Sequence, residues 1–199
     1  MKIEYFGHSY FRISGNDYSI SLDPFSNIGL REEKTKSDYL FASHKHYDHS
    51  NESIVEYKKK ITTSDNIFTI ISTKHDEQGG SLRGENSVLL FNLDGYKVAF
   101  LGDLGESDSQ ILINKLQGVD LLLICIGGKY TIDYKSANNY IEKINPKKVI
   151  PMHYKVYNST VDIDNVDNFL HGKKYTEKYY EYEYNENDDK FIYLVAKRG

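Results

Sequence analysis

The chain has 199 residues, 27% of them charged and 39% hydrophobic, values that are ordinary for one soluble globular domain. Its formal net charge of -4 disfavours a protein that binds nucleic acid through a basic face. No apolar stretch approaches the roughly 20 residues that span a bilayer, and residues 1–5 begin a strand-like pattern with no signal-peptide-like apolar segment. We therefore expect a single cytoplasmic domain over residues 1–199, with neither a membrane nor a nucleic acid as partner.

The first quarter of the chain is predicted to form short strands that are separated by turns rich in glycine and Asx residues. These strands are expected at 3–6, 9–13, 18–22 and 39–42. The charged segment 27–37 is predicted to be an exposed loop, or a lid beside a site. Residues 50–59 are expected to form a short helix, capped by Ser50 or Asn51.

Strands that alternate with helices are predicted after residue 60. The clearest local signal is Asp94-Gly95, which predicts the turn of a hairpin. The expected strands are 67–72, 87–93, 96–101, 119–126 and 148–151. Because 119–126 is continuously apolar, it should be buried on both faces. Its Cys125, the only cysteine, is then a small hydrophobic residue rather than a reactive or ligating thiol.

Two helices and a closing hairpin are predicted in the same part of the chain. Ser107 and Gln110 resemble a capping box, and Gly118 is placed to end the helix that they begin. The apolar positions within 137–144 follow helical spacing. Two tyrosine-rich alternating runs within 178–197 predict a hairpin that completes the fold.

The segment 43–49, Ser-His-Lys-His-Tyr-Asp-His, indicates a metal site. Three imidazoles and one carboxylate lie close together after an apolar run, and a core gains nothing from them because each buried polar ring needs a partner. Neutral imidazole and carboxylate are ligands of zinc, manganese and iron. In an extended segment His44 and His46 point to one side, whereas a turn must aim Asp48 and His49 elsewhere. This arrangement favours two neighbouring metal ions over one.

Further candidate ligands follow other predicted strands, namely His75, Asp103 and His153. Each of them alone would more often be an ordinary satisfied histidine or a turn residue. Together with the four donors of 43–49 they are sufficient for two divalent ions with open positions for water and substrate. A one-metal or degenerate site is the alternative.

The order of these motifs resembles the metallo-beta-lactamase superfamily, which implies an α+β fold, a four-layer αββα sandwich with a metal site along one edge. More narrowly, the chain resembles the small metal-dependent hydrolases related to ascorbate-6-phosphate lactonase. The matching segments are Gly7-His8-Ser9, Asp23-Pro24-Phe25, 125–132 and Pro151-Met152-His153-Tyr154. The chain departs from that branch in a shorter stretch between His49 and His75 and in Ile132, where methionine is common.

The resemblance implies a role for each candidate residue. The implied ligands are His44, His46 and His75 for one metal, Asp48, His49 and His153 for the second, and Asp103 as the bridge between them. Asp48 and Asp103 would also be the catalytic carboxylates. Asp23 would be a buried carboxylate that supports the histidine segment without binding metal.

The residues that contact the substrate are less determined. Lys129, Tyr130 and Tyr154 flank strand ends that carry ligands, so they are candidates to line the pocket, with exposed loop positions as the alternative. His8 is either a structural turn residue or a contact to the substrate or to a ligand. His171, in a polar stretch, is expected on the surface.

The expected activity is hydrolysis at a dinuclear site, with zinc favoured over manganese or iron. Metal ions lower the pKa of bound water from 15.7 to about 7, so metal-bound hydroxide is available at neutral pH. The positive charge of the centre favours a small anionic substrate, namely an ester, a lactone or a phosphodiester. The alternatives are an iron-dependent oxidoreductase, a nuclease of the same superfamily and a non-catalytic metal-binding protein. The oligomeric state, including a homo-oligomer, is left open.

Overall fold

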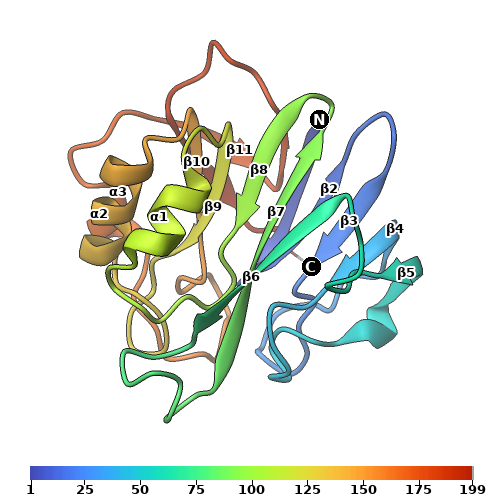
Figure 1. The fold of residues 1–199 in the computed structure, drawn as a ribbon, viewed down its shortest axis with the longest axis horizontal. Coiled ribbons are helices and arrows are strands. Elements are labelled where there is room, and N and C mark those ends of the chain that lie inside the picture. Colours follow the sequence, from blue (N-terminus) through green and yellow to red (C-terminus); the bar gives the residue numbers. More distant parts are fainter. Residues whose placement is uncertain (199) are drawn as a thin grey trace.

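The computed structural model describes residues 1–198 and contains two β-sheets that pack face to face, with three α-helices along one of them (Figure 1). The strand order is β12-β1-β2-β3-β4-β5 in the first sheet and β11-β13-β10-β9-β8-β7-β6 in the second. The predicted α+β sandwich is confirmed. Within residues 1–198 no helix is long and apolar enough to cross a membrane.

The first sheet is built mainly from the N-terminal quarter of the chain. Its strands are β1 (Lys2–Gly7), β2 (Tyr10–Ser14), β3 (Ser19–Leu22), β4 (Thr35–Phe41), β5 (Val55–Lys60) and β12 (Glu181–Glu183). The loop predicted at 27–37 ends sooner than expected, because β4 begins at Thr35. The helix predicted at 50–59 is wrong. A 3₁₀ turn, Glu52–Ile54, leads into β5, where Val55 and Tyr57 face inward while their neighbours are exposed, a period-2 pattern that suits a strand beside β4.

The second sheet contains the predicted hairpin, β7 and β8, next to its edge strand β6. Its strands are β6 (Phe68–Lys74), β7 (Glu85–Leu93), β8 (Tyr96–Phe100), β9 (Leu121–Cys125), β10 (Lys148–Met152), β11 (Tyr175–Tyr179) and β13 (Phe191–Val195). Asp94 and Gly95 have φ values of 53° and 83°, the positive angles that the tight turn between β7 and β8 requires. Every residue of β9 is buried, as predicted, including Cys125.

The predicted closing hairpin is wrong, because the two tyrosine-rich runs pair with different sheets. The first run provides β12, which lies antiparallel to β1. The second provides β13, which lies parallel to both β10 and β11. Tyr182 of β12 and Ile192 and Leu194 of β13 are buried in the core. Pairing with both sheets buries more apolar surface than a separate hairpin would.

The helices α1 (Gln110–Leu116), α2 (Tyr134–Ile144) and α3 (Asp167–Leu170) all lie beside the second sheet (Figure 1). The capping box predicted at Ser107 and Gln110 is wrong by two residues, since the Ser109 side chain accepts the Leu112 N–H at 3.4 Å. Gly118, with φ 73°, follows α1 as predicted. The apolar face predicted within 137–144 is the buried face of α2.

Two aromatic rings connect the sheets just below the strand ends that carry the candidate ligands. Phe41 ends β4, directly before the histidine segment, and Phe100 ends β8, shortly before Asp103. Their ring centroids lie 6.4 Å apart with an interplanar angle of 89°, an edge-to-face contact between the sheets. Phe11 of β2 meets the same Phe100 ring at 6.5 Å. This packing fixes the two chain segments relative to each other.

We expect Phe100→Ala to lower the free energy of unfolding by about 3–5 kcal/mol, because it removes a fully buried ring and leaves a cavity between the sheets. Urea denaturation measures the change. The matched control is Tyr157→Ala, which truncates a ring that is 75% exposed and should change stability by no more than about 0.5 kcal/mol. Equal midpoints for both variants would contradict the structural role of Phe100.

Candidate metal centre

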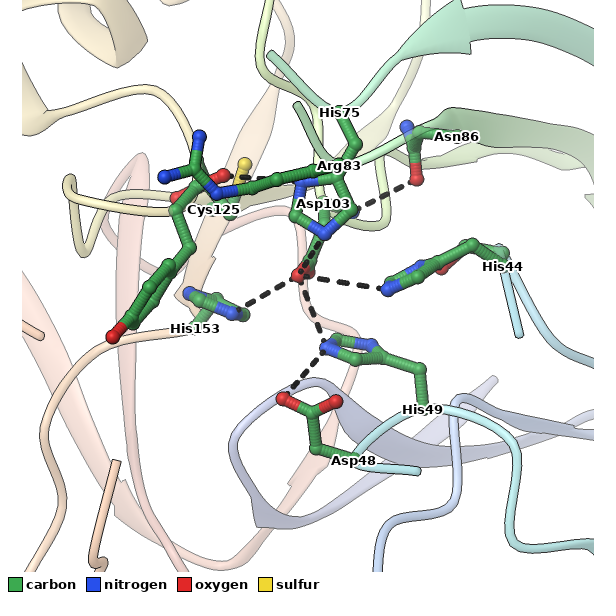
Figure 2. Close-up of polar contacts among 12 residues, drawn as sticks. His44, Asp48, His49, His75, Arg83, Asn86, Asp103, Cys125 and His153 are labelled. Atoms are coloured by element: carbon green, nitrogen blue, oxygen red, sulfur yellow. Dashed lines mark hydrogen bonds and ion pairs between the residues drawn. The ribbon is translucent and has the colours of Figure 1, made fainter. Parts of the chain in front are cut away.

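Side chains from separate strand ends converge on one carboxylate oxygen, Oδ2 of Asp103 (Figure 2). This oxygen lies 3.1 Å from Nε2 of both His49 and His153. It lies 3.2 Å from Nε2 of His75 and 3.9 Å from Nε2 of His44. Ligands that bind zinc at about 2.0–2.2 Å are themselves roughly 3–3.5 Å apart, so the spacing of these donors suits a shared ion.

The donors form two groups of three histidines, and Asp103 contacts members of both. In each group the ligand atoms lie within 4.8 Å of one another. The first group is His44, His46 and His75, and the second is His8, His49 and His153. The first group is the set that the sequence assigned to one metal. The second includes His8, which the sequence prediction left out of the ligand set.

Asp48 lies at the edge of the second group. Its Oδ2 is 3.3 Å from Nε2 of His8 and 3.8 Å from Nε2 of His49. The carboxylate is 18% exposed, whereas the His8 and His49 side chains are buried. Asp48 therefore lies beside the second group, where it can contact both an ion held by that group and a molecule that enters from solvent.

Asp103 is held by a buried amide that the sequence analysis missed. The Asp103 N–H donates to Oδ1 of Asn86 at 3.0 Å, and Nδ2 of Asn86 donates to Thr73 Oγ1 at 2.8 Å and to the Leu101 carbonyl at 3.0 Å. Gly102 has φ 54°, and a Cβ there would lie 2.5 Å from Asn86 Oδ1. The available signal was an asparagine at an inward position of a strand whose other inward positions are apolar.

Asp23 lies directly behind the histidine segment. Its carboxylate accepts the Ser43 N–H at 2.7 Å, the Ser43 hydroxyl at 2.5 Å and Nδ1–H of His49 at 2.8 Å. The Ser43 oxygen in turn lies 2.9 Å from Nδ1 of His44. Since these contacts occupy both Nδ1 atoms, His44 and His49 present Nε2 to the centre.

The other ligand-bearing loops are constrained by their backbones. Nδ1 of His75 is 3.1 Å from the Tyr130 carbonyl oxygen, which leaves Nε2 of His75 facing Asp103. The His153 N–H donates to the His8 carbonyl at 2.8 Å. His8 and His153 both have positive φ, 54° and 51°, which a non-glycine residue adopts only where its surroundings impose it.

Two buried atoms of the cluster lack hydrogen-bond partners in the described part of the chain, and their chemistry shows whether the site fits a cation. Within residues 1–198, Nε2 of His44 and Oδ1 of Asp103 have no hydrogen-bond partner, and such groups are costly to leave unsatisfied. Burial, with the charge of nearby His49, lowers the pKa of His44 to about 2, so its ring is neutral and can donate a lone pair. Burial opposes ionisation of Asp103, but His153 and His49 hold its pKa well below the usual value. Neutral imidazole and ionised carboxylate fit divalent metal ions.

A cavity of about 650 Å³ opens beside the cluster, and its walls include Asp48, His75, Asp103, His153 and Tyr130. Of the residues predicted to contact substrate, Tyr130 therefore lies at the site. His8 does not line the cavity and instead contacts Asp48 and His49 through its Nε2 atom. Lys129 does not line this cavity, but its ammonium pairs at 2.7 Å with Asp162, which does.

The structure does not place Tyr154 at the site. Its side chain is 2% exposed and packs against Tyr5, and its hydroxyl donates to the Leu194 carbonyl at 3.0 Å. The prediction that Tyr154 contacts substrate is therefore wrong. The backbone turn at His153 directs the two neighbouring side chains to different places, one to the cluster and one to the core.

We expect Asp23→Asn to weaken metal binding by about 10- to 100-fold, because the amide cannot accept Nδ1–H of His49 and the Ser43 donors together as the carboxylate does. A competition titration with a chromophoric chelator measures this. The matched control is Asp38→Asn, since Asp38 also accepts a backbone N–H and a hydroxyl, both of Ser19, but away from the centre. Equal metal affinities in the two variants would contradict the supporting role of Asp23.

Comparison with known proteins gives a consistent assignment. A family model described as the beta-lactamase superfamily domain matches residues 2–153. A protein of Carboxydothermus hydrogenoformans named UPF0173 metal-dependent hydrolase is 26% identical over 79% of this chain and 86% of its own. A relative of the same name from Staphylothermus marinus is 29% identical over 78% of this chain and 84% of its own.

Solved structures show the same fold. A protein of Thermotoga maritima, described as a proposed Zn-dependent hydrolase of the metallo-beta-lactamase superfamily, aligns with a TM-score of 0.78 and 27% identity, and covers 98% of this chain and 99% of that one. An isothiocyanate hydrolase from Delia radicum gut bacteria aligns with a TM-score of 0.64 over 97% of this chain and 95% of its own, at 12% identity, and shows the shared fold alone. The family match and the shared fold together establish that the chain belongs to the metallo-beta-lactamase superfamily.

Proposed function

We propose that this protein is a metal-dependent hydrolase that binds two divalent ions, with zinc favoured, and cleaves a small anionic ester, lactone or phosphodiester. The observation that carries the proposal is the pair of three-histidine groups that share Asp103 at the wall of an open cavity. A purely structural zinc site needs four ligands and a closed shell. Two incomplete groups that border a cavity instead leave room for water and substrate. The names of the UPF0173 relatives support the same class of activity.

The ligands of the first ion would be His44, His46 and His75, and Asp103 would contact both ions. Those of the second would be His49, His153 and, as the family resemblance implies, Asp48. His8, the third histidine of that group, would contact Asp48 and His49. Such ions lower the pKa of bound water to about 7 and stabilise negative charge that develops on substrate oxygens. Asp48 is ionised at neutral pH, because contacts with His8 and His49 outweigh burial and hold its pKa below the usual value. Its exposed edge faces the cavity, where it can accept a proton from an attacking water molecule.

The ester and lactone classes follow from the resemblance to the lactonase-related branch. The cavity supports a small substrate, because its volume of about 650 Å³ is within the usual range for small-molecule sites. Because histidine binds a metal ion as neutral imidazole, two divalent ions with few carboxylates around them would form a positive centre, which favours an anionic group at the reacting end.

We expect freshly purified protein to contain about two divalent ions per chain, and His46→Ala to lose about one of them together with most hydrolysis. Elemental analysis measures the metal, and a panel of lactones, phosphodiesters, thioesters and peptides measures turnover. His171→Ala removes an exposed histidine away from the cluster and serves as the matched control. A metal-loaded protein that cleaves none of these bonds would exclude the hydrolase proposal for these classes.

We expect Asp103→Asn to reduce turnover by at least about 100-fold, since an amide neither bridges two cations nor contributes the negative charge that balances them. Metal content and kcat are measured on the same preparation, so that loss of an ion is separated from loss of chemistry. If Asp103→Asn retained both its full metal content and its full turnover, Asp103 would not bridge the two ions.

A further inference from the structure

Two cations at the rim of the candidate active site have no acidic partner within residues 1–198, Lys45 and Arg83. Other lysines in this region form ion pairs with carboxylates. Lys129 pairs with Asp162 at 2.7 Å, and Lys60 pairs with Glu52. Unpaired positive charge beside a metal cluster is unfavourable unless solvent or a ligand compensates it, so these two side chains can take an anion.

Both cations lie where two cavities meet. Arg83 and Lys45, together with His46, border the 650 Å³ cavity beside Asp103. The same three residues border a neighbouring cavity of about 710 Å³. In Figure 2 the Arg83 side chain extends past His75 and Asp103, and all three residues border this cavity. A molecule that occupies the site can therefore reach past the predicted ligands to the guanidinium.

A rigid loop determines where Arg83 lies. The buried Asp76 carboxylate accepts the backbone N–H groups of Gln78 at 2.8 Å, Gly80 at 3.0 Å, Leu82 at 3.0 Å and Arg83 at 2.8 Å. Arg83 contributes only its N–H to this loop, which leaves its side chain free.

The guanidinium is also placed against the cluster by an aromatic ring. Cζ of Arg83 lies 5.4 Å from the centroid of the Tyr130 ring. The carbonyl of the same Tyr130 contacts Nδ1 of His75 at 3.1 Å, and His75 begins the loop that ends near Arg83. Stacking on a ring face leaves the N–H edge of a guanidinium available for a planar anion.

We propose that Arg83, assisted by Lys45, forms a subsite for a second anionic group of the substrate, a carboxylate or a phosphate, at a distance from the bond that is cleaved. The inference rests on the proposed hydrolase function and narrows its substrate to small esters or lactones that carry such a remote charge. Guanidinium binds carboxylate and phosphate through two parallel hydrogen bonds, which fixes the orientation of the substrate as well as its charge.

The test compares two esters of equal chain length, mono-4-nitrophenyl glutarate and 4-nitrophenyl valerate, which end in a carboxylate and in a methyl group. We expect Arg83→Gln to raise KM for the glutarate ester by about 10- to 100-fold, with kcat changed less than about threefold and the valerate ester unaffected. Arg83→Lys should recover part of the difference. Arg31→Gln, which removes an arginine paired with Glu33 elsewhere, should change neither ester. Equal effects of Arg83→Gln on both esters, or no effect, would overturn the subsite.

A binding measurement separates this inference from the hydrolase proposal. Glutarate and inorganic phosphate are titrated calorimetrically into metal-loaded wild type and Arg83→Gln with equal metal content. If neither ester is cleaved but Arg83→Gln binds glutarate or phosphate about 10-fold more weakly than the wild type, the proposal of ester hydrolysis is wrong and the proposal of the Arg83 subsite is supported. If both proteins bind both anions equally, the metals alone account for binding and the subsite is wrong.

Discussion

The site depends on one buried carboxylate that lies among imidazole rings. Asp103 is 3% exposed, and its Oδ2 lies within 3.2 Å of three Nε2 atoms that come from both sheets. Such crowding of buried polar groups is costly unless each charge and lone pair is compensated. The surrounding chain supplies this compensation for the backbone through Asn86, and a bound cation would supply it for the side chains. The remaining features of the site hold the histidine rings in position around this carboxylate.

Hydrogen bonds on the outer side of the histidine rings determine which nitrogen of each ring faces the centre. Asp23, Ser43 and the Tyr130 carbonyl occupy the Nδ1 positions, so that the opposite nitrogens meet at one point. Each of these partners lies on a loop that follows a strand, and the rigid sandwich determines where those loops begin. Ligand orientation is therefore a property of the sheets and of the hydrogen bonds behind the site, and not of the histidine segment alone.

Features that depend on local chemistry were predictable from the sequence, and those that depend on distant pairing were not. The spacing within 43–49 and the Asp94-Gly95 turn are local signals, and the structure contains the expected cluster and hairpin. The tail instead pairs with β1 and β10, which lie far away in sequence, and residues 55–60 form a strand that pairs with β4. The position of His8 in the second group, and that of Tyr154 in the core, depend on the backbone conformation after two strands, which no short motif encodes.

The origin of the ligands has a consequence for folding. In each three-histidine group, some members follow strands of the first sheet and others follow strands of the second. An ion bound by either group therefore acts as a cross-link between the halves of the sandwich, comparable to a disulfide in that it joins segments distant along the chain. Because the unfolded chain cannot assemble either group, the free energy of metal binding is added to the free energy of unfolding. Bound metal would thereby couple catalytic competence to resistance to denaturation.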